Sequence, residues 1–134
     1  MNLNIINKLP KEFQKYNISK IETGASKKLF YKIKNMKNSF IVTDFTLEKK
    51  DYYNHLKIYN LLSKINISIP KIIQNSDKNL LMITEDFGDL RYDKILDKYP
   101  LKDLLQYAVD TLAVLNDSIQ FNEDSGLVQY NFDI

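Results

Sequence analysis

The chain has 134 residues, 44% of them hydrophobic, with three glycines and three prolines, which indicates one folded domain rather than a disordered segment. Its net charge is +2 and Arg91 is its single arginine, so the composition argues against a nucleic-acid-binding protein, which concentrates basic residues on one face. The chain has no cysteine and one histidine, which excludes disulfides and thiol chemistry and argues against a zinc site.

The N-terminal region has no apolar run long enough for a signal peptide or a membrane span. We therefore expect a cytoplasmic protein that has neither a membrane nor a nucleic acid as its partner. A first helix is predicted from about Ile5 to Tyr16, although Pro10 interrupts it.

Three strands are predicted next, at residues 18–21, 29–33 and 39–43. The first alternates apolar and polar residues, and the second is rich in aromatic and β-branched residues. Because short segments of small or polar residues connect them, we expect an antiparallel meander.

The second half of the chain begins with a helical period over residues 49–65. A short strand is predicted at 71–74. The continuous apolar run at 80–84 predicts an interior strand that is buried on both faces. Apolar residues at steps of three and four predict a long helix over 101–119, and the tail at 120–134 shows no strong pattern.

Small residues fill the segment between the first two predicted strands, where Gly24, Ala25 and Ser26 precede Lys27 and Lys28. Such a loop lets backbone N–H groups approach a phosphate, and the lysines could neutralise its charge. It lacks the Gly-Lys-Ser/Thr sequence of a Walker loop. From this segment alone, an ordinary hairpin turn with solvated lysines is the better interpretation.

Two other features have a simpler explanation than a catalytic role. Asp86, Phe87 and Gly88 form the triplet by which protein kinases hold magnesium, but no His-Arg-Asp-type loop precedes it. A coincidence or a hinge is therefore favoured over a metal ligand. His55 has no second histidine or cysteine beside it, so we predict a partly exposed helix residue.

Four segments together resemble the aminoglycoside-phosphotransferase and choline-kinase family. Within that family they are most similar to bacterial kinases that phosphorylate the anomeric hydroxyl of cell-wall amino sugars. The matching segments are the glycine loop and following strand at 24–32, the strand end and turn at 42–51, the Leu-Leu and Ile-Pro pairs at 61–72, and the hinge-like segment at 82–89.

The resemblance implies an α+β fold with a protein-kinase-like N-terminal lobe at residues 18–89, containing a five-stranded antiparallel sheet and one packed helix. A helical segment at 1–17 would precede this lobe. A hinge and one long helix, within 90–134, would follow it as the start of a C-terminal lobe. The implied function is that of an ATP-dependent phosphotransferase acting on a sugar or amino sugar, with magnesium bound to the ATP.

The resemblance also implies which residues contact the nucleotide. Residues 23–28 would cover the ATP phosphates, with Lys32 as a further phosphate contact. The backbone of Glu85, Asp86 and Phe87 would pair with the adenine edge. The apolar wall around the base would be formed by Ile21, Ile33, Ile41 and Met82.

Two departures from the family pattern matter. Kinase-like folds carry a lysine on the third strand, whereas Asp44 stands there in this chain; an Asp44–Lys57 contact of reversed polarity is one alternative. The catalytic loop is also missing, because no His-x-Asp followed by Asn occurs. We therefore expect a truncated form that lacks catalytic and metal-binding residues and is inactive alone, with its acceptor and the choice of ATP or GTP undetermined.

A second hypothesis is a non-catalytic binding or regulatory module that associates through the 101–119 helix. The apolar stripe of this helix would otherwise stay in water, so we expect the helix to pack back on the sheet, to dimerise or to be mobile. A third hypothesis, a nucleic-acid-binding domain, requires the lysines to converge on one face.

Overall fold

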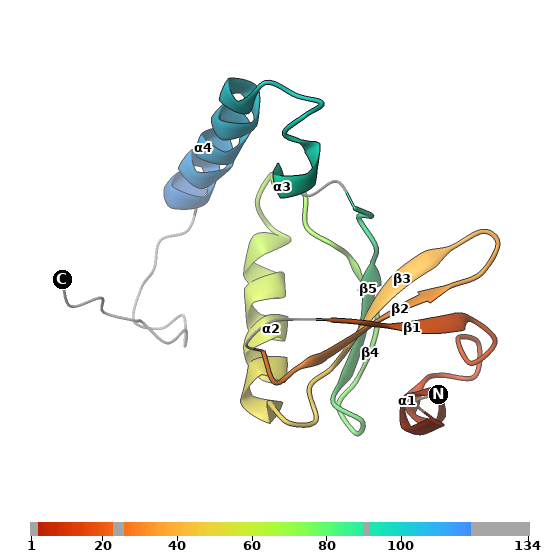
Figure 1. Cartoon of the computed structure of the whole chain (residues 1–134). Helices are drawn as coiled ribbons and strands as arrows, with labels where there is room; N and C mark the ends of the chain where they lie inside the picture. Colours follow the sequence, from red (N-terminus) through yellow and green to blue (C-terminus); the bar gives the residue numbers. More distant parts are fainter. Residues whose placement is uncertain (1–2, 23–25, 90–91, 119–134) are drawn as a thin grey trace. The chain divides into compact units, whose positions relative to one another are not determined.

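The computed structural model describes residues 3–22, 26–89 and 92–118. The fold is α+β, with a five-stranded antiparallel sheet and several helices (Figure 1). In chain order the elements are α1 (Leu3–Lys8), β1 (Asn17–Ile21), β2 (Leu29–Lys34), β3 (Ser39–Asp44), α2 (Lys49–Leu62), β4 (Ile72–Ser76), β5 (Leu81–Glu85), α3 (Tyr92–Ile95) and α4 (Leu101–Ser118).

The strand order in the sheet is β1-β2-β3-β5-β4, and every neighbouring pair is antiparallel. The predicted meander of the first three strands is therefore confirmed. The prediction for β5 is also confirmed, because it lies between β3 and β4 and its residues Leu81, Met82 and Ile83 are all buried.

One face of the sheet packs against the N-terminal segment. Ile5, Leu9 and Phe13 from this segment are buried against apolar residues of β2, β3 and β5, among them Ile33 and Val42. We call this the α1 face of the sheet. The alternation of side chains along each strand separates it from the opposite face.

The N-terminal helix is shorter than predicted, because α1 ends at Lys8 rather than near Tyr16. Pro10 cannot donate a backbone hydrogen bond and restricts the residue before it, so the helix ends there. The chain continues in turns, in which the N–H of Phe13 donates to the Pro10 carbonyl at 2.9 Å. Phe13 nevertheless reaches the core.

The opposite face carries Thr43 and Met82, both buried, and we call it the α2 face. The first turns of α2 are fixed beside it through the fully buried ring of Tyr52, which lies edge-on to Phe45 with ring centroids 5.5 Å apart. The Tyr52 hydroxyl donates to Asp77 and accepts from the Asn75 amide at 2.9 Å. Figure 1 shows α1 and the first turns of α2 on different sides of the sheet.

The chain divides into two compact units. The sheet unit comprises residues 1–55 and 69–89, so the N-terminal segment, predicted as a separate stretch at 1–17, belongs to the same unit as the sheet. Of the described residues, 56–68 and 92–118 form the helical unit. Of the helices in the described ranges, none combines the length and the hydropathy that a membrane span needs.

Within the helical unit, α4 follows the predicted periodicity to the last described residue, Ser118. It buries Leu104. Its exposed apolar side chains are Leu101, Leu105, Tyr107, Val109, Leu112 and Val114.

Candidate functional site

The residues predicted to form one apolar wall do not share a face of the sheet. Ile21 pairs with Phe30, and Lys32 pairs with Ile41, which places Ile21, Ile41 and Met82 on the α2 face through the strand register. Ile33 pairs with Ile18 on β1 and lies on the α1 face, where its side chain is 0% exposed. The structure therefore removes Ile33 from this wall and leaves Ile21, Ile41 and Met82.

Lys28 stands at the end of the segment that connects β1 to β2, directly before Leu29. The alternation along β2 puts it on the α2 face with Phe30 and Lys32. Its Nζ donates to Oδ2 of Asp51, in the first turn of α2, at 2.9 Å. The same ammonium lies 5.9 Å from the centroid of the Phe45 ring. A strand lysine is thus paired with a helix carboxylate.

The rest of the predicted phosphate loop is only partly described. Thr23, Gly24 and Ala25 lie outside the described residues. Ser26 and Lys27 are exposed, and the Ser26 hydroxyl accepts a hydrogen bond from the N–H of Lys28 at 3.2 Å. This bond within the loop fixes the backbone immediately before β2.

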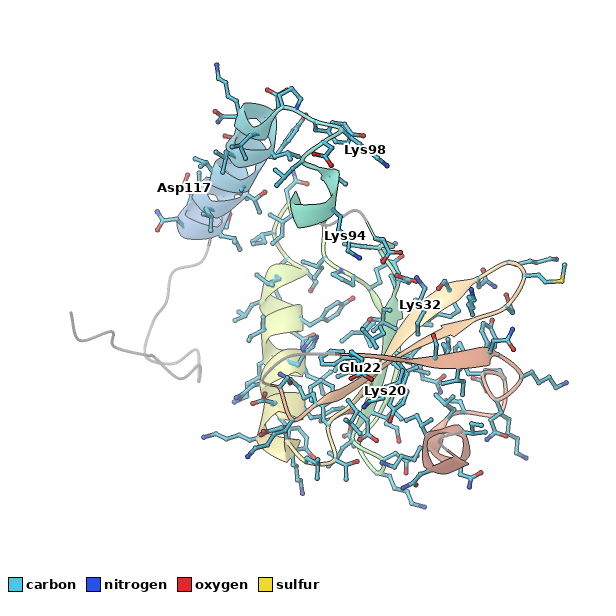
Figure 2. All side chains as sticks on the ribbon, viewed as in Figure 1. Lys20, Glu22, Lys32, Lys94, Lys98 and Asp117 are labelled. Carbon is cyan, nitrogen blue, oxygen red and sulfur yellow. The ribbon has the colours of Figure 1, made fainter. Side chains whose placement is uncertain are left out.

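Lys32, labelled in Figure 2, is tied to the far end of the sheet rather than to this loop. Its Nζ lies 2.8 Å from Oδ2 of Asp86, just beyond the end of β5. The Ser39 hydroxyl donates to the same oxygen at 2.6 Å, and the N–H of Gly88 donates to Oδ1 at 2.9 Å. Both oxygens of Asp86 therefore accept hydrogen bonds from the chain itself.

These contacts change the pKa values of the pair. Burial alone would raise the pKa of Asp86, whose side chain is 6% exposed, but the hydrogen bonds from Lys32, Ser39 and Gly88 outweigh it and hold the pKa below its ordinary value. The hydrogen bond to Asp86 raises the pKa of Lys32. Both groups are therefore charged at neutral pH, and the pair fastens the segment after β5 to the sheet.

The predicted hinge has one backbone group already in use. The N–H of Glu85 donates to the Lys71 carbonyl at 2.9 Å, and the Glu85 carboxylate accepts from the N–H of Lys71 at 3.0 Å. The Glu85 N–H is therefore not available to a base, whereas its carbonyl and the backbone groups of Asp86 and Phe87 remain in the predicted set. Gly88 follows with a φ of 75°, a left-handed conformation that favours glycine.

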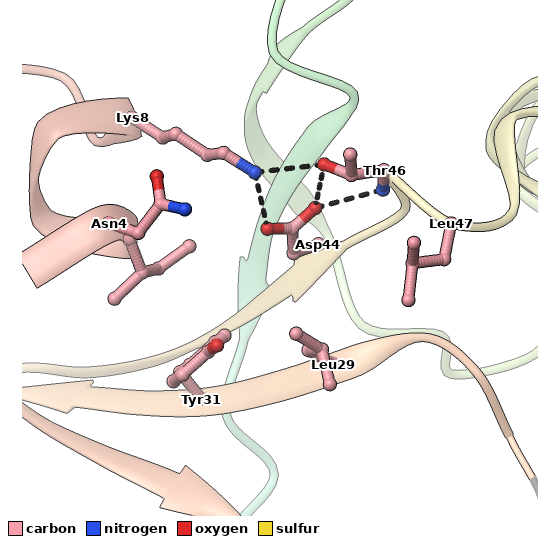
Figure 3. A pocket seen from close by; sticks show the side chains of 8 residues that line it. Asn4, Lys8, Leu29, Tyr31, Asp44, Thr46 and Leu47 are labelled. Carbon is pink, nitrogen blue, oxygen red and sulfur yellow. Dashed lines mark hydrogen bonds and ion pairs between the residues drawn. The ribbon is translucent and has the colours of Figure 1, made fainter. Parts of the chain in front are cut away.

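Asp44 faces the α1 side, where its partner is Lys8 rather than Lys57 (Figure 3). The Lys8 ammonium donates to Asp44 Oδ2 at 2.7 Å and to the Thr46 hydroxyl at 2.8 Å. Burial would raise the pKa of Asp44, but the hydrogen bonds from Lys8 and Thr46 hold it below its ordinary value. Strand alternation explains the correction, because Asp44 shares its face with Val42.

These residues border a cavity of about 230 Å³ between α1 and the end of β3, shown in Figure 3. It is lined by Asn4, Ile5, Lys8, Leu29, Tyr31, Asp44, Thr46 and Leu47. The cavity lies on the α1 face and is separate from the wall residues on the α2 face.

His55 is exposed, as predicted, and its ring lies 5.8 Å from that of Phe45. Partial desolvation, followed by repulsion from Lys28, lowers the pKa of His55 below its ordinary value. The imidazole is therefore neutral at neutral pH and adds no charge near Lys28.

Sequence reasoning missed three residues of this arrangement: Asp51, Phe45 and Ser39. Asp51 and Phe45 hold Lys28, and Ser39 holds Asp86. Lysines and acids mixed along an amphipathic helix are typical of its solvated face, and an acidic residue in a first helical turn has an ordinary explanation in the helix dipole. One sequence contains no signal that singles out Asp51.

Comparisons with protein-family models, curated proteins and solved structures found no match to this chain. Within the described ranges, no group of three or more histidine, aspartate or glutamate side chains is arranged to hold a metal ion. What the geometry offers is a sheet face that carries Ile21, Ile41 and Met82, with the Lys28 ammonium fixed at the end nearest the β1–β2 loop.

Proposed function

We propose that this chain is the nucleotide-binding lobe of an ATP-dependent small-molecule phosphotransferase. The observation that carries the proposal is the position of Lys28. It lies at the end of the β1–β2 loop, on the face that also carries Ile21, Ile41 and Met82, and it is held by a carboxylate of α2.

This arrangement suits the two chemically different ends of ATP. The flat base favours apolar walls with a few placed polar groups, which Ile21, Ile41 and the backbone after β5 supply. The triphosphate needs cationic hydrogen-bond donors, which Lys28 and the exposed Lys27 supply. Kinases bind the phosphates with a lysine of the third strand that pairs with an acidic residue of a helix. The Lys28–Asp51 pair is of this kind, although Lys28 directly precedes β2 and does not lie on β3.

The structure changes the role that we propose for Lys32. Lys32 is bound to Asp86 beyond the end of β5, away from the β1–β2 loop, and the Asp86 side chain is only 6% exposed. We therefore assign Lys32 to holding the hinge segment and not to the phosphates. Phosphate contact then falls to the loop residues Ser26, Lys27 and Lys28. We continue to assign the adenine edge to the Glu85 carbonyl and to the backbone of Asp86 and Phe87.

The chemical step needs groups that we do not assign in this chain. Phosphoryl transfer requires magnesium ligands and an acid that orients the acceptor hydroxyl. Bound ATP would supply the γ-phosphoryl group, and the residues described here would bind and orient the nucleotide. A sugar or amino-sugar acceptor is proposed from the sequence resemblance alone.

Isothermal titration calorimetry of the chain with ATP, with and without magnesium, tests the proposal. We expect measurable binding that Lys28→Met weakens about tenfold or more, because a charge-assisted bond to phosphate is lost. Lys37→Met is the matched control, since this exposed lysine lies in the β2–β3 turn at the other end of the strands. A folded chain that binds no ATP, or an equal loss in both variants, would contradict the proposal.

A second candidate function, a non-catalytic module that associates through α4, is favoured by the exposed apolar side chains of that helix, such as Leu105, Val109 and Leu112. Sedimentation analysis would detect concentration-dependent self-association. If the module associates through α4, a Leu105→Gln/Val109→Gln variant should be monomeric. A chain that is monomeric and binds ATP would exclude self-association as its function.

A further inference from the structure

The cavity on the α1 face is separate from the residues assigned to the nucleotide, and all of its lining residues belong to the sheet unit. Its volume is about 230 Å³. Most ligand pockets have roughly 300–1,000 Å³, whereas an apolar cavity of about 150 Å³ accepts a benzene molecule. The cavity therefore has room for a single ring with a small substituent, and not for a nucleotide.

The lining of this cavity combines apolar walls with one ion pair. Ile5 of α1, Leu29 of β2 and Leu47 of the β3–α2 loop supply apolar surface. Figure 3 shows the linked side chains of Lys8 and Asp44 above Leu29. A molecule in the cavity thus meets hydrocarbon and charged groups together.

The ion pair is fixed by hydrogen bonds, but its hydrogen-bonding capacity is not exhausted. The Lys8 ammonium donates to Asp44 and to the Thr46 hydroxyl, which uses two of its three donors. The Asp44 side chain is 8% exposed and accepts from Lys8 and from the N–H and hydroxyl of Thr46. Because a carboxylate has about four acceptor positions, the bonds within the described ranges leave one donor on Lys8 and one acceptor position on Asp44.

The charges of the lining favour an uncharged ligand. Lys8 and Asp44 are the charged side chains among the lining residues, and their formal charges cancel. Tyr31 stays neutral, because burial and the nearby Asp44 raise the pKa of its hydroxyl. A charged ligand would lose its hydration without meeting a net opposite charge, which is costly. A hydroxyl group, in contrast, can accept from the ammonium and donate to the carboxylate at the same time.

We propose that this cavity binds a small uncharged molecule that carries one hydroxyl group on an apolar ring, such as a phenol or a cyclic alcohol. The ring packs against Ile5, Leu29 and Leu47. The hydroxyl accepts a hydrogen bond from Lys8 and donates one to Asp44. Because the cavity lies on the α1 face, the inference does not rest on the proposed function.

NMR titrations of the unaltered chain with phenol and with toluene test the proposal. We expect phenol to bind with a dissociation constant of about 1 mM and to shift the methyl signals of Ile5, Leu29 and Leu47. Toluene has the size of phenol but no hydroxyl, so it should bind about fivefold more weakly. If the cavity offered only apolar contact, the order would be reversed, because the phenol hydroxyl would give up its bonds to water without replacement.

Two asparagines of α1 provide matched variants. Asn4 and Asn7 are both exposed, and of the two only Asn4 lines the cavity. Asn4→Phe places a ring at the cavity and should abolish phenol binding, whereas Asn7→Phe should leave it unchanged. If Asn4→Phe does not fold, the order of the compounds on the unaltered chain still decides.

Four results would overturn the inference. They are no phenol binding, binding of toluene as tight as that of phenol or tighter, tighter binding of benzoate or benzylammonium than of phenol, and an equal effect of the two asparagine variants. Phenol binding that exceeds toluene binding and is lost only in Asn4→Phe would support it. Because the titrations contain no nucleotide, their outcome is independent of the proposed function.

Discussion

Two isoleucines on neighbouring strands allow a direct test of the division between the two faces of the sheet. Ile33 on β2 is 0% exposed and packs on the α1 face, and Ile41 on β3 is half-buried on the α2 face. Truncating a fully buried isoleucine to alanine costs about 2–5 kcal/mol, a large part of the roughly 5–15 kcal/mol that stabilises a domain. We expect Ile33→Ala to lower the free energy of unfolding by this amount.

For Ile41→Ala we expect a smaller loss of stability and a larger loss of ATP affinity. The side chain is already partly in water, so less apolar burial is lost on truncation. If the base lies against Ile41, the lost contact is worth about 1 kcal/mol, which is about a fivefold weaker affinity.

Urea denaturation measures the first quantity and calorimetry with ATP measures the second, on both variants under the same conditions. The decisive comparison is the ratio of the two effects. A folded Ile33→Ala chain that loses ATP affinity, together with an Ile41→Ala chain that keeps it, would show that the faces are assigned wrongly.

Two other predictions follow from the buried polar groups. In the folded chain the pKa values of Asp44 and Asp86 lie below their ordinary value of 3.8, so the unfolded chain binds more protons at these groups. The stability that the two carboxylates contribute is therefore present above about pH 4. It is lost as the pH falls through the pKa values of the folded chain. The urea midpoint of unfolding should therefore fall as the pH is lowered from about 7 to about 3, and it should fall less steeply in the Asp44→Asn variant. An equally steep fall in that variant would refute the lowered pKa of Asp44. Tyr52→Phe removes a buried hydroxyl that binds both Asp77 and Asn75, and should cost about 1–3 kcal/mol of unfolding free energy; a neutral effect in urea denaturation would show that this network does not anchor α2.

Local sequence patterns were sufficient to predict most helices and strands. Alternation and β-branched residues located β1, β2 and β3 to within a residue, because strand side chains repeat with a period of two. The apolar run around Leu81–Ile83 predicted an interior strand correctly, since only a strand covered on both faces tolerates such a run. The predicted first helix extended too far because the effect of Pro10 was given too little weight.

The tertiary structure decided which of these elements meet and therefore which residues share a site. The pairing of β3 with β5 and the register of β1 on β2 put Ile41 and Met82 on one face and Ile33 on the other. The ion pair between Lys28 and Asp51 joins residues that are 23 positions apart. This pair depends on how α2 packs on the sheet. Local periodicity contains no information about that packing, because it reports only which side of its own element a residue occupies.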